Sequence, residues 1–240
     1  MAALKGVSFE VMAGQRFGIV GESGSGKSTL VRLLAALDRP TGGTISFRGV
    51  RIDHLPERRL KFLRDELQIV FQDPMGSLDP RMRVKDIICE PLGRADDRAG
   101  RLRELLDAVG LPQDAAARYP HQFSGGQRQR ISIARALAPH PKVLVADEPV
   151  SALDVSVRAQ ILDLLVDLVE RYDLTLVFVS HDLSVVRRVC DTVAVLRRGE
   201  IVELGDVEQV YQRPAHPYTR ELIAAAPTLR GALARFQEGS

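Results

Sequence analysis

The sequence predicts an α/β fold: a mostly parallel β-sheet covered by helices on both faces, with antiparallel β elements and an all-helical insert. Two observations carry this prediction. Short runs rich in Val, Ile and Phe alternate with segments of helical periodicity, and most of these runs are apolar throughout, which is typical of parallel strands buried between helices. From residue 84 to residue 138, by contrast, every periodic segment is helical.

Each predicted element follows from its local pattern. Strands are predicted at residues 6–11, 16–20, 68–71, 142–147 and 174–180, and hairpins or strand pairs at 44–52 and 192–205. Helices are predicted at residues 26–37, 56–67, 126–138, 156–172 and 183–189, with a turn-rich loop at 72–82. The helix at 156–172 is amphipathic, because apolar residues recur along one face: Ile161, Leu165, Leu168 and Tyr172.

Composition and charge are those of an ordinary globular protein. The chain has 240 residues, 45% of them hydrophobic and 27% charged, and a formal net charge of +2. A net charge this close to zero argues against a protein that binds nucleic acid mainly through a large positive charge. Cys89 and Cys190 are far apart and predict free thiols in a reducing compartment. Because neither a signal peptide nor a membrane-spanning run is visible, we expect a cytosolic chain that reaches a membrane only through a partner.

A glycine- and serine-rich loop separates the predicted strand at 16–20 from the helix after it. Residues 21–29 (GESGSGKST) fit the pattern GxxxxGK[ST] in the strand–loop–helix context that this pattern requires. Glycines let the backbone N–H groups approach phosphate oxygens, Lys27 would reach the β- and γ-phosphates, and the Ser28 hydroxyl would ligate Mg²⁺. The alternative is a plain Gly/Ser turn. The residues assigned to phosphate binding are Gly21, Glu22, Ser23, Gly24, Ser25, Gly26, Lys27, Ser28 and Thr29.

Two adjacent carboxylates end the predicted strand at 142–147. Asp147 can hold Mg²⁺, and Glu148 can orient and deprotonate an attacking water. Carboxylates buried at a strand end need a partner or a metal. The alternative is an acidic helix cap before Pro149.

A second helix start with free N–H groups lies about 100 residues after the first. Residues 123–130 (FSGGQRQR) open the predicted helix at 126–138. Since one ATP has a single γ-phosphate, the economical arrangement is a head-to-tail dimer in which each nucleotide lies between residues 21–29 of one subunit and 124–127 of the other. The residues assigned to this second contact are Ser124, Gly125, Gly126 and Gln127.

Together these motifs resemble the ATP-binding subunit of ATP-binding cassette (ABC) transporters. Residues 21–29 match the Walker A motif, FSGGQ at 123–127 matches the signature motif with Phe for the commoner Leu, and Asp147 and Glu148 match Walker B and its catalytic glutamate. Order and spacing agree across nearly the whole chain. The resemblance implies a P-loop NTPase core of the RecA-like type, with ATP and Mg²⁺ as its ligands.

Three further site residues are implied by the resemblance alone. Gln72 matches the Q-loop glutamine, Asp154 in SALD the D-loop, and His181 in VSHD the switch histidine. In this family Gln72 would sense the γ-phosphate and Mg²⁺, and His181 would contact the γ-phosphate and help hold the transition state. Without the shared pattern, the better interpretations would be a loop amide for Gln72 and, for His181, a strand-end histidine that caps the next helix.

Several stretches resemble the oligopeptide/dipeptide importer group of this family, above all the tail RPAHPYTRELIAAAP at 213–227. From its residues this tail predicts only a loop containing prolines and a short helix.

Two departures from the family matter. The aromatic residue that usually stacks on adenine is not found in MAALKG, before the strand at 6–11, so the chain is truncated, has a misplaced start, or holds adenine otherwise; Phe9 is expected in the core. No cysteine follows Cys190, so no iron–sulfur site is expected.

The resemblance implies an ATPase subunit that powers an importer for oligopeptides or dipeptides, with nickel or an oligosaccharide as alternative cargo. Expected partners are a second cassette, identical or a sister subunit, two transmembrane permease subunits at the cytoplasmic face of the membrane and, indirectly, a solute-binding protein, but not nucleic acid. The expected parts are a core at 1–72 and 142–213, a helical subdomain at 73–141 and a C-terminal extension at 214–240. A soluble cassette ATPase acting on DNA or ribosomes is a further alternative, whereas a plain P-loop kinase leaves FSGGQ and SALD unexplained.

Overall fold

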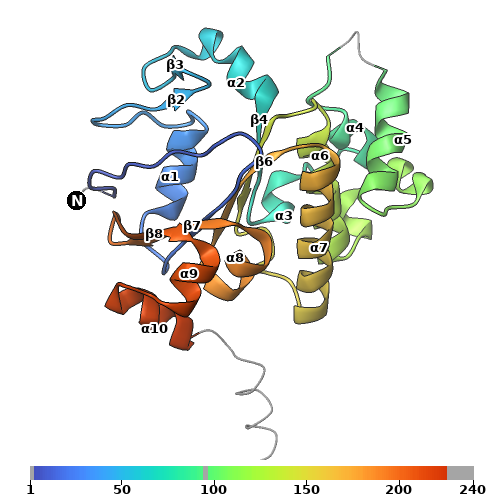
Figure 1. Ribbon diagram of the computed structural model, residues 1–240. Helices are drawn as coiled ribbons and strands as arrows, with labels where there is room; N and C mark the ends of the chain where they lie inside the picture. Colours follow the sequence, from blue (N-terminus) through green and yellow to red (C-terminus); the bar gives the residue numbers. More distant parts are fainter. Residues whose placement is uncertain (1–2, 94–96, 226–240) are drawn as a thin grey trace, which may run out of the picture.

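A six-stranded sheet forms the centre of the molecule (Figure 1). In this computed structural model, residues 3–93 and 97–225 are described. The strands of the sheet are β1 (Arg16–Val20), β4 (Leu67–Val70), β5 (Val143–Asp147), β6 (Thr175–Ser180), β7 (Thr192–Arg197) and β8 (Glu200–Asp206). Their order is β4-β5-β6-β1-β7-β8, and all neighbours pair in parallel except β7 and β8. The prediction of a mostly parallel sheet with an antiparallel hairpin is confirmed.

Helices cover both faces of this sheet, as expected for apolar strands. The α-helices are α1 (Lys27–Leu34), α2 (Lys61–Glu66), α3 (Pro74–Ser77), α4 (Val84–Ile88), α5 (Arg98–Ala108), α6 (Gly125–Leu137), α7 (Val155–Arg171), α8 (Leu183–Val189), α9 (Val207–Gln212) and α10 (Pro217–Ala225). Successive residues of β6 point to opposite faces. Leu176 and Phe178 pack with α6, α7 and α8, whereas Val177 and Val179 pack with α1 and α2.

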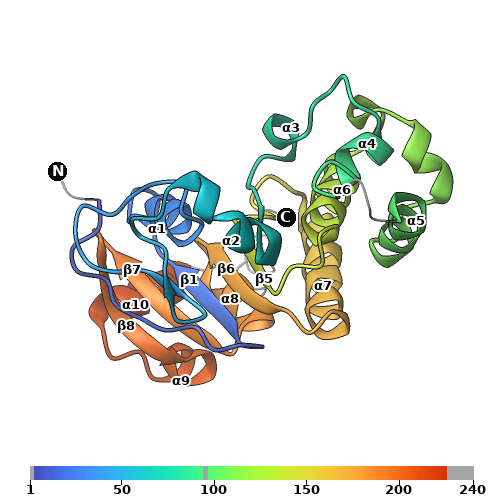
Figure 2. The ribbon, with the colours of Figure 1, turned by 90° about the horizontal axis from the view of Figure 1, so that it is seen from above.

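Every element described between β4 and β5 is helical, which agrees with the predicted insert. Besides α3 to α6 these residues include the 3₁₀ turns η2 (Gln113–Ala117) and η3 (Pro120–Gln122). Figure 2 shows α4 and α5 beyond α6 and α7, on the side of the molecule away from α1, whereas α3 lies on the α1 side of α6. The long helix α6 joins this group to the sheet, because it packs against α4 and α5 as well as against β4 and α7.

The strand predicted at 6–11 is wrong, because this segment pairs with no strand of the sheet. Its alternating pattern has a different cause: Val7, Phe9 and Val11 pack against the cluster that covers the α1 face of the sheet, while the residues between them are exposed. The Phe9 ring stacks on the Phe17 ring, with centroids 5.1 Å apart. The expectation that Phe9 belongs to the core is therefore confirmed, although no strand contains it.

Other boundaries differ by a few residues. The helix predicted at 26–37 ends at Leu34, since Ala36 has a φ of +50° that a helix cannot continue through. The pattern at 56–67 divides into the 3₁₀ turn η1 (Glu57–Arg59) and α2, and the loop at 72–82 contains the short helix α3. The pair predicted at 44–52 is β2 (Ser46–Phe47) with β3 (Val50–Arg51).

The chain ends, as far as it is described, in two short helices beside the hairpin β7–β8. Both α9 and α10 lie next to α8 (Figure 1), and the buried ring of Tyr218 brings α10 into the main core. Residues 226–240 of the predicted extension lie outside the described residues. Among the described residues, no helix is both long and apolar enough to cross a bilayer.

Candidate functional site

Four adjacent strands end at one edge of the sheet, and each is followed by residues predicted for the site. The loop 21–29 follows β1, Asp147 ends β5 with Glu148 next to it, His181 follows β6, and Gln72 lies two residues beyond β4. Because β4, β5, β6 and β1 are neighbours and parallel, their carboxyl ends lie side by side. In open α/β sheets this edge is where ligands bind.

Lys27 connects the phosphate-binding loop to the end of β5. Its Nζ donates to the backbone oxygens of Gly21 (2.7 Å) and Glu22 (2.9 Å), so the side chain folds back over its own loop. The same Nζ lies 3.5 Å from Oε1 of Glu148, and the Lys27 side chain is only 5% exposed. A buried ammonium group needs such partners. The arrangement fixes a positive charge between the loop and the carboxylate.

The loop is built to present backbone N–H groups. Gly24 and Gly26 have φ angles of +78° and +110°, which other residues rarely adopt, and they turn the chain directly into α1. Gly26 is the N-cap of α1 and supplies no side-chain cap, so the first-turn N–H groups of the helix keep their donor capacity. The buried Ser25 hydroxyl has no hydrogen-bond partner among the described residues. With Lys27, these donors fit a polyphosphate.

Glu148 has an unusual backbone that turns its side chain back toward the loop. Its φ is +45°, held by a hydrogen bond from its N–H to the Val179 oxygen (2.9 Å) and by the Ser151 hydroxyl, which donates to the Glu148 oxygen (3.1 Å). One carboxylate oxygen faces Lys27 and the other lies 3.0 Å from Nδ1 of His181. Strained residues of this kind cluster at functional sites. The structure thus brings together Lys27, Glu148 and His181 from three strand ends.

The turn between β6 and α8 positions His181. The N–H of Asp182 donates to the Ser180 hydroxyl (3.0 Å), and the Asp182 carboxylate caps α8 by accepting from the Ser184 N–H (2.8 Å). Asp182, rather than His181, is therefore the helix cap, which removes the alternative role considered for the histidine. A cavity of about 10 Å³, near the size of one water molecule, borders both His181 and Glu148.

The predicted Mg²⁺ ligands lie along the same edge, but no hydrogen bond joins them. Burial raises the pKa of Asp147, the neighbouring Glu148 charge raises it further, and Lys27 opposes both effects. Ser28 and Gln72 are exposed. In the described ranges there is no cluster of three or more His, Cys, Asp or Glu residues that could hold a metal. One carboxylate with hydroxyl and amide oxygens fits Mg²⁺, which keeps several waters and binds substrate phosphates.

The segment 124–127 is fixed by its own hydrogen bonds and is separate from this site. Ser124 and Gln127 form a capping box at the start of α6: the Gln127 N–H donates to the Ser124 hydroxyl (3.3 Å), and the Ser124 N–H donates to Oε1 of Gln127 (3.0 Å). Both residues are exposed. In the described part of the chain, no hydrogen bond or ion pair links this segment to residues 21–29.

Gly126 also has a packing role at the start of α6. It is buried, and a Cβ placed on it would lie 2.4 Å from Cγ1 of Val157 in α7. A Cβ on Gly125 would lie 3.4 Å from Leu153, within SALD. The glycines thus let α6 approach α7, so the two predicted segments 124–127 and 151–154 are neighbours. Asp154, the exposed N-cap of α7, makes no side-chain cap.

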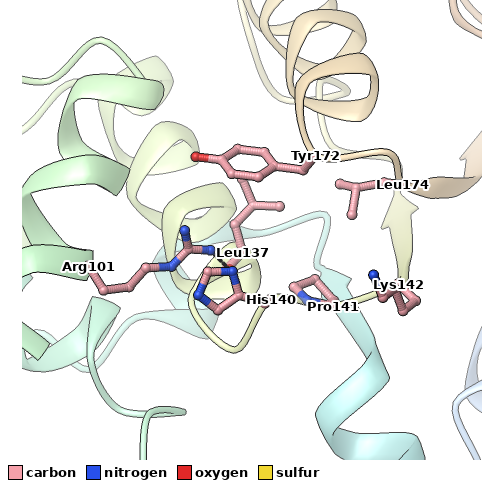
Figure 3. A pocket seen from close by; sticks show the side chains of 7 residues that line it. All are labelled: Arg101, Leu137, His140, Pro141, Lys142, Tyr172 and Leu174. Carbon is pink, nitrogen blue, oxygen red and sulfur yellow. Dashed lines mark hydrogen bonds between the residues drawn. The ribbon is translucent and has the colours of Figure 1, made fainter. Parts of the chain in front are cut away.

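A larger cavity, of about 100 Å³, lies at the opposite edge of the sheet (Figure 3). It is lined by Arg101, Leu137, His140, Pro141, Lys142, Tyr172 and Leu174, which come from α5, the end of α6 and the segments that precede β5 and β6. Arg101 donates to the carbonyl oxygens of Leu137 (2.5 Å) and Ala138 (3.2 Å) and pairs with Glu104. These contacts satisfy the carboxyl end of α6, so the cavity belongs to a structural junction and not to the site.

One residue that contacts the loop was not found from the sequence. The hydroxyl of Tyr218, in the tail segment HPYT, accepts a hydrogen bond of 2.9 Å from the Glu22 N–H. The tail had predicted only a loop and a short helix. Its one usable signal was an aromatic residue between a proline and a threonine, which does not reveal a partner 196 residues away in the chain.

Comparisons with known proteins agree with this geometry. The family described as ABC transporter matches residues 4–151, and the family described as oligopeptide/dipeptide transporter, C-terminal region, matches residues 202–238. The chain is 52% identical over 230 residues to the glutathione import ATP-binding protein GsiA of Escherichia coli (strain K12) and to that of Shigella sonnei (strain Ss046). Each alignment covers 94% of this chain but 37% of the relative, so the chain spans little more than a third of their length.

Two solved structures share the fold over most of their length. One is a dimeric post-hydrolysis state of the ATP-binding cassette MJ0796 bound to ADP and Pi, which is 34% identical, with a TM-score of 0.77 over 85% of this chain and 90% of that one. The other is cbiO1 from Clostridium perfringens, part of the ABC transporter complex cbiONQ, which is 29% identical, with a TM-score of 0.81 over 97% of this chain and 92% of that one. The chain therefore belongs to the ABC transporter family and has the P-loop ATPase fold of its nucleotide-binding cassettes.

Proposed function

We propose that this chain binds and hydrolyses ATP as the motor subunit of an importer. The observation that carries the proposal is the cluster of Lys27, Glu148 and His181 beside a glycine-rich loop whose N–H groups face the same edge of the sheet. This set supplies a cation and backbone donors for phosphates, and a carboxylate for a water.

The roles of the residues follow from their contacts. The loop 21–29 and Lys27 hold the phosphates and spread their charge. Glu148 accepts the proton of the attacking water, and its bond to His181 fixes the direction of its carboxylate. This bond supports a role for the imidazole at the reacting phosphate. A bound Mg²⁺ would neutralise phosphate charge. Ser28, Asp147 and Gln72 are the proposed residues that hold it.

The second part of the proposal concerns a partner cassette. Ser124 and Gln127 are exposed and, among the described residues, make no hydrogen bond or ion pair with the loop of the same chain. Asp154 and the 81% exposed Val155 lie close by, since Gly125 approaches Leu153. The relative MJ0796 is a dimer. These observations support a composite site formed by residues 21–29 of one chain and 124–127, with Asp154, of another.

Mixing two inactive variants tests this composite site. Lys27→Ala removes the loop function and Ser124→Arg blocks the opposite surface, so each variant as a homodimer has no intact site. A mixed dimer regains one complete site, and random mixing should restore about a quarter of the wild-type ATPase rate. Circular dichroism establishes that both variants fold. If the mixture stays as inactive as its components while the wild type is active, the composite site is wrong.

The importer assignment rests on the match of residues 202–238 to the oligopeptide/dipeptide transporter region and on the likeness to GsiA. We propose a core at 1–72 and 142–213, a helical subdomain at 73–141 that contacts two membrane-embedded permease subunits, and an extension at 214–240. This places the chain at the cytoplasmic face of the membrane, with a peptide-like cargo delivered by a solute-binding protein. Affinity purification from membranes should recover polytopic proteins with the chain, and recovery of nucleic acid in their place would contradict the assignment.

A further inference from the structure

The tail segment 214–219 is anchored to the hairpin β7–β8 by a single carboxylate. Glu203 of β8 accepts hydrogen bonds from the Ala215 N–H (2.8 Å), the His216 N–H (3.1 Å) and the Thr219 hydroxyl (2.5 Å). Partial burial acts to raise the pKa of Glu203, but these three bonds lower the pKa overall, which keeps the carboxylate ionised. Three bonds on one carboxylate fix the position of the segment that carries Tyr218.

From this anchor Tyr218 reaches the phosphate-binding loop. Its side chain is 1% exposed, the guanidinium of Arg197 lies 4.6 Å from the centre of its ring, and its hydroxyl accepts the Glu22 N–H at 2.9 Å. Burial raises the pKa of Tyr218, so the hydroxyl stays neutral at physiological pH. Glu22 precedes the first turn of α1, so this bond leaves the N–H groups of that turn to the ligand.

The same hairpin contacts the loop at a second place. At the turn between β7 and β8, the Gly199 N–H donates to the Ser25 oxygen (2.9 Å). The loop is therefore held at Glu22 by the tail and at Ser25 by the hairpin, and Glu203 ties the tail to the hairpin. These contacts lie on both sides of Gly24, which has a positive φ here and, as a glycine, could adopt several backbone geometries in a free loop.

We propose that Tyr218 is a positioning residue that holds the phosphate-binding loop in its binding geometry through the Glu22 amide. The tail is thus a support for the nucleotide site, a role not assigned by its likeness to other transporters. This inference rests on the proposed ATP binding. The contact pre-organises the loop for binding. If it is lost, a smaller fraction of molecules has the binding-competent loop, and the apparent dissociation constant for ATP rises by the same factor.

Tyr218→Phe removes only the hydroxyl, and Tyr211→Phe in α9 makes the same change away from the loop. Hydrogen–deuterium exchange of the nucleotide-free full chain measures the Glu22 amide directly. Loss of one hydrogen bond should speed its exchange by about 2- to 12-fold in Tyr218→Phe. Tyr211→Phe should match the wild type. Equal exchange in all three proteins would overturn the inference, and this readout does not depend on ATP binding.

Nucleotide binding gives the second readout. In calorimetric titrations with MgATP, Tyr218→Phe should weaken binding by about 2- to 10-fold and raise KM by a similar factor, with kcat changed less than twofold, because the reacting groups are untouched. Unchanged affinity overturns the inference. A wild type that does not bind MgATP refutes the proposed function instead, while the exchange result still decides whether Tyr218 holds the loop.

A third measurement covers the case in which Tyr218→Phe does not fold. By reciprocity, a contact that favours ATP binding must itself be strengthened by ATP. MgATP added to the wild type should therefore slow exchange of the amides in α10 (Pro217–Ala225). Unchanged exchange there, with ATP bound, would contradict the proposal. Thr219→Val, which loses one bond to Glu203, should loosen α10 more than it loosens the Glu22 amide; the reverse order would also contradict it.

Discussion

Two helix starts of this chain are predicted to contact phosphate, but they are capped and placed differently: Gly26 gives α1 no side-chain cap, whereas Ser124 and Gln127 form a capping box on α6. The start of α1 pairs through Lys27 with Glu148, which in turn contacts His181, so most of the groups proposed for its chemistry lie together within one chain. The start of α6 is capped by its own side chains, packs on α7 and meets none of those groups. A helix N-terminus is therefore not a site by itself; its neighbours decide whether one chain suffices.

The largest effect is expected from Glu148→Gln, which changes the site at the start of α1. The amide cannot accept the proton of the attacking water, so ATPase turnover should fall by about 10²–10⁴-fold. ATP binding should persist, and sedimentation with MgATP should show an accumulated dimer. Wild-type turnover in this variant would mean that another group is the base.

The next effect is on nucleotide affinity. Lys27→Ala removes a charged donor from the loop and leaves Glu148 without its cation, so MgATP binding should weaken by about 10- to 150-fold. Calorimetric titration measures this loss. Lys61→Ala, at an exposed lysine of α2, is the control with the same loss of charge and should bind like the wild type. Equal affinities of the two variants would contradict the role of Lys27.

Ser124→Ala sharpens the comparison because it should separate binding from turnover. The variant loses a donor expected to face the partner's nucleotide, so the ATPase rate should fall about 10-fold, whereas MgATP affinity of the isolated chain should not change. The lost cap should also cost about 1 kcal/mol of stability, which differential scanning calorimetry can detect. If the isolated Ser124→Ala chain bound MgATP more weakly than the wild type, Ser124 would contribute to the nucleotide site of its own chain.

The smallest effect concerns Asp147. Its pKa is raised in the folded chain, so the folded state binds a proton more tightly than the unfolded state does, and the ionised carboxyl lowers stability at pH values above its folded pKa. Asp147→Asn should therefore raise the Tm at pH 7 by about 1–8 °C while it lowers ATPase activity.

The pH dependence checks the cause of that change. The gain in Tm should shrink as the pH falls and the wild-type carboxyl becomes protonated. Asp167→Asn, at an exposed position of α7, should show no comparable gain. A gain that persists unchanged in acid would point to packing and not to charge.

The strand and helix periodicities, together with the motif spacing, predicted most of the fold. β5, β6, α7 and α8 lie within a residue or so of their predicted ranges, because their patterns reflect burial on a sheet covered on both faces. The same reasoning failed at 6–11, where alternation reflects packing without a pairing strand. A sequence pattern shows which side of a segment is buried, but not whether backbone partners are available to it.

The sequence by itself determined that Asp147 ends a strand and that Lys27 and Glu148 come after strands, since local patterns set where strands end and which side chains come next. Only the tertiary structure decided that Glu148 turns back on a positive φ between Lys27 and His181, that Gly126 serves contact with α7, and that Tyr218 reaches the Glu22 amide. The physical reason is distance along the chain. Periodicity and spacing report interactions over a few residues, whereas these contacts join segments brought together by the order of the strands and the packing of the core.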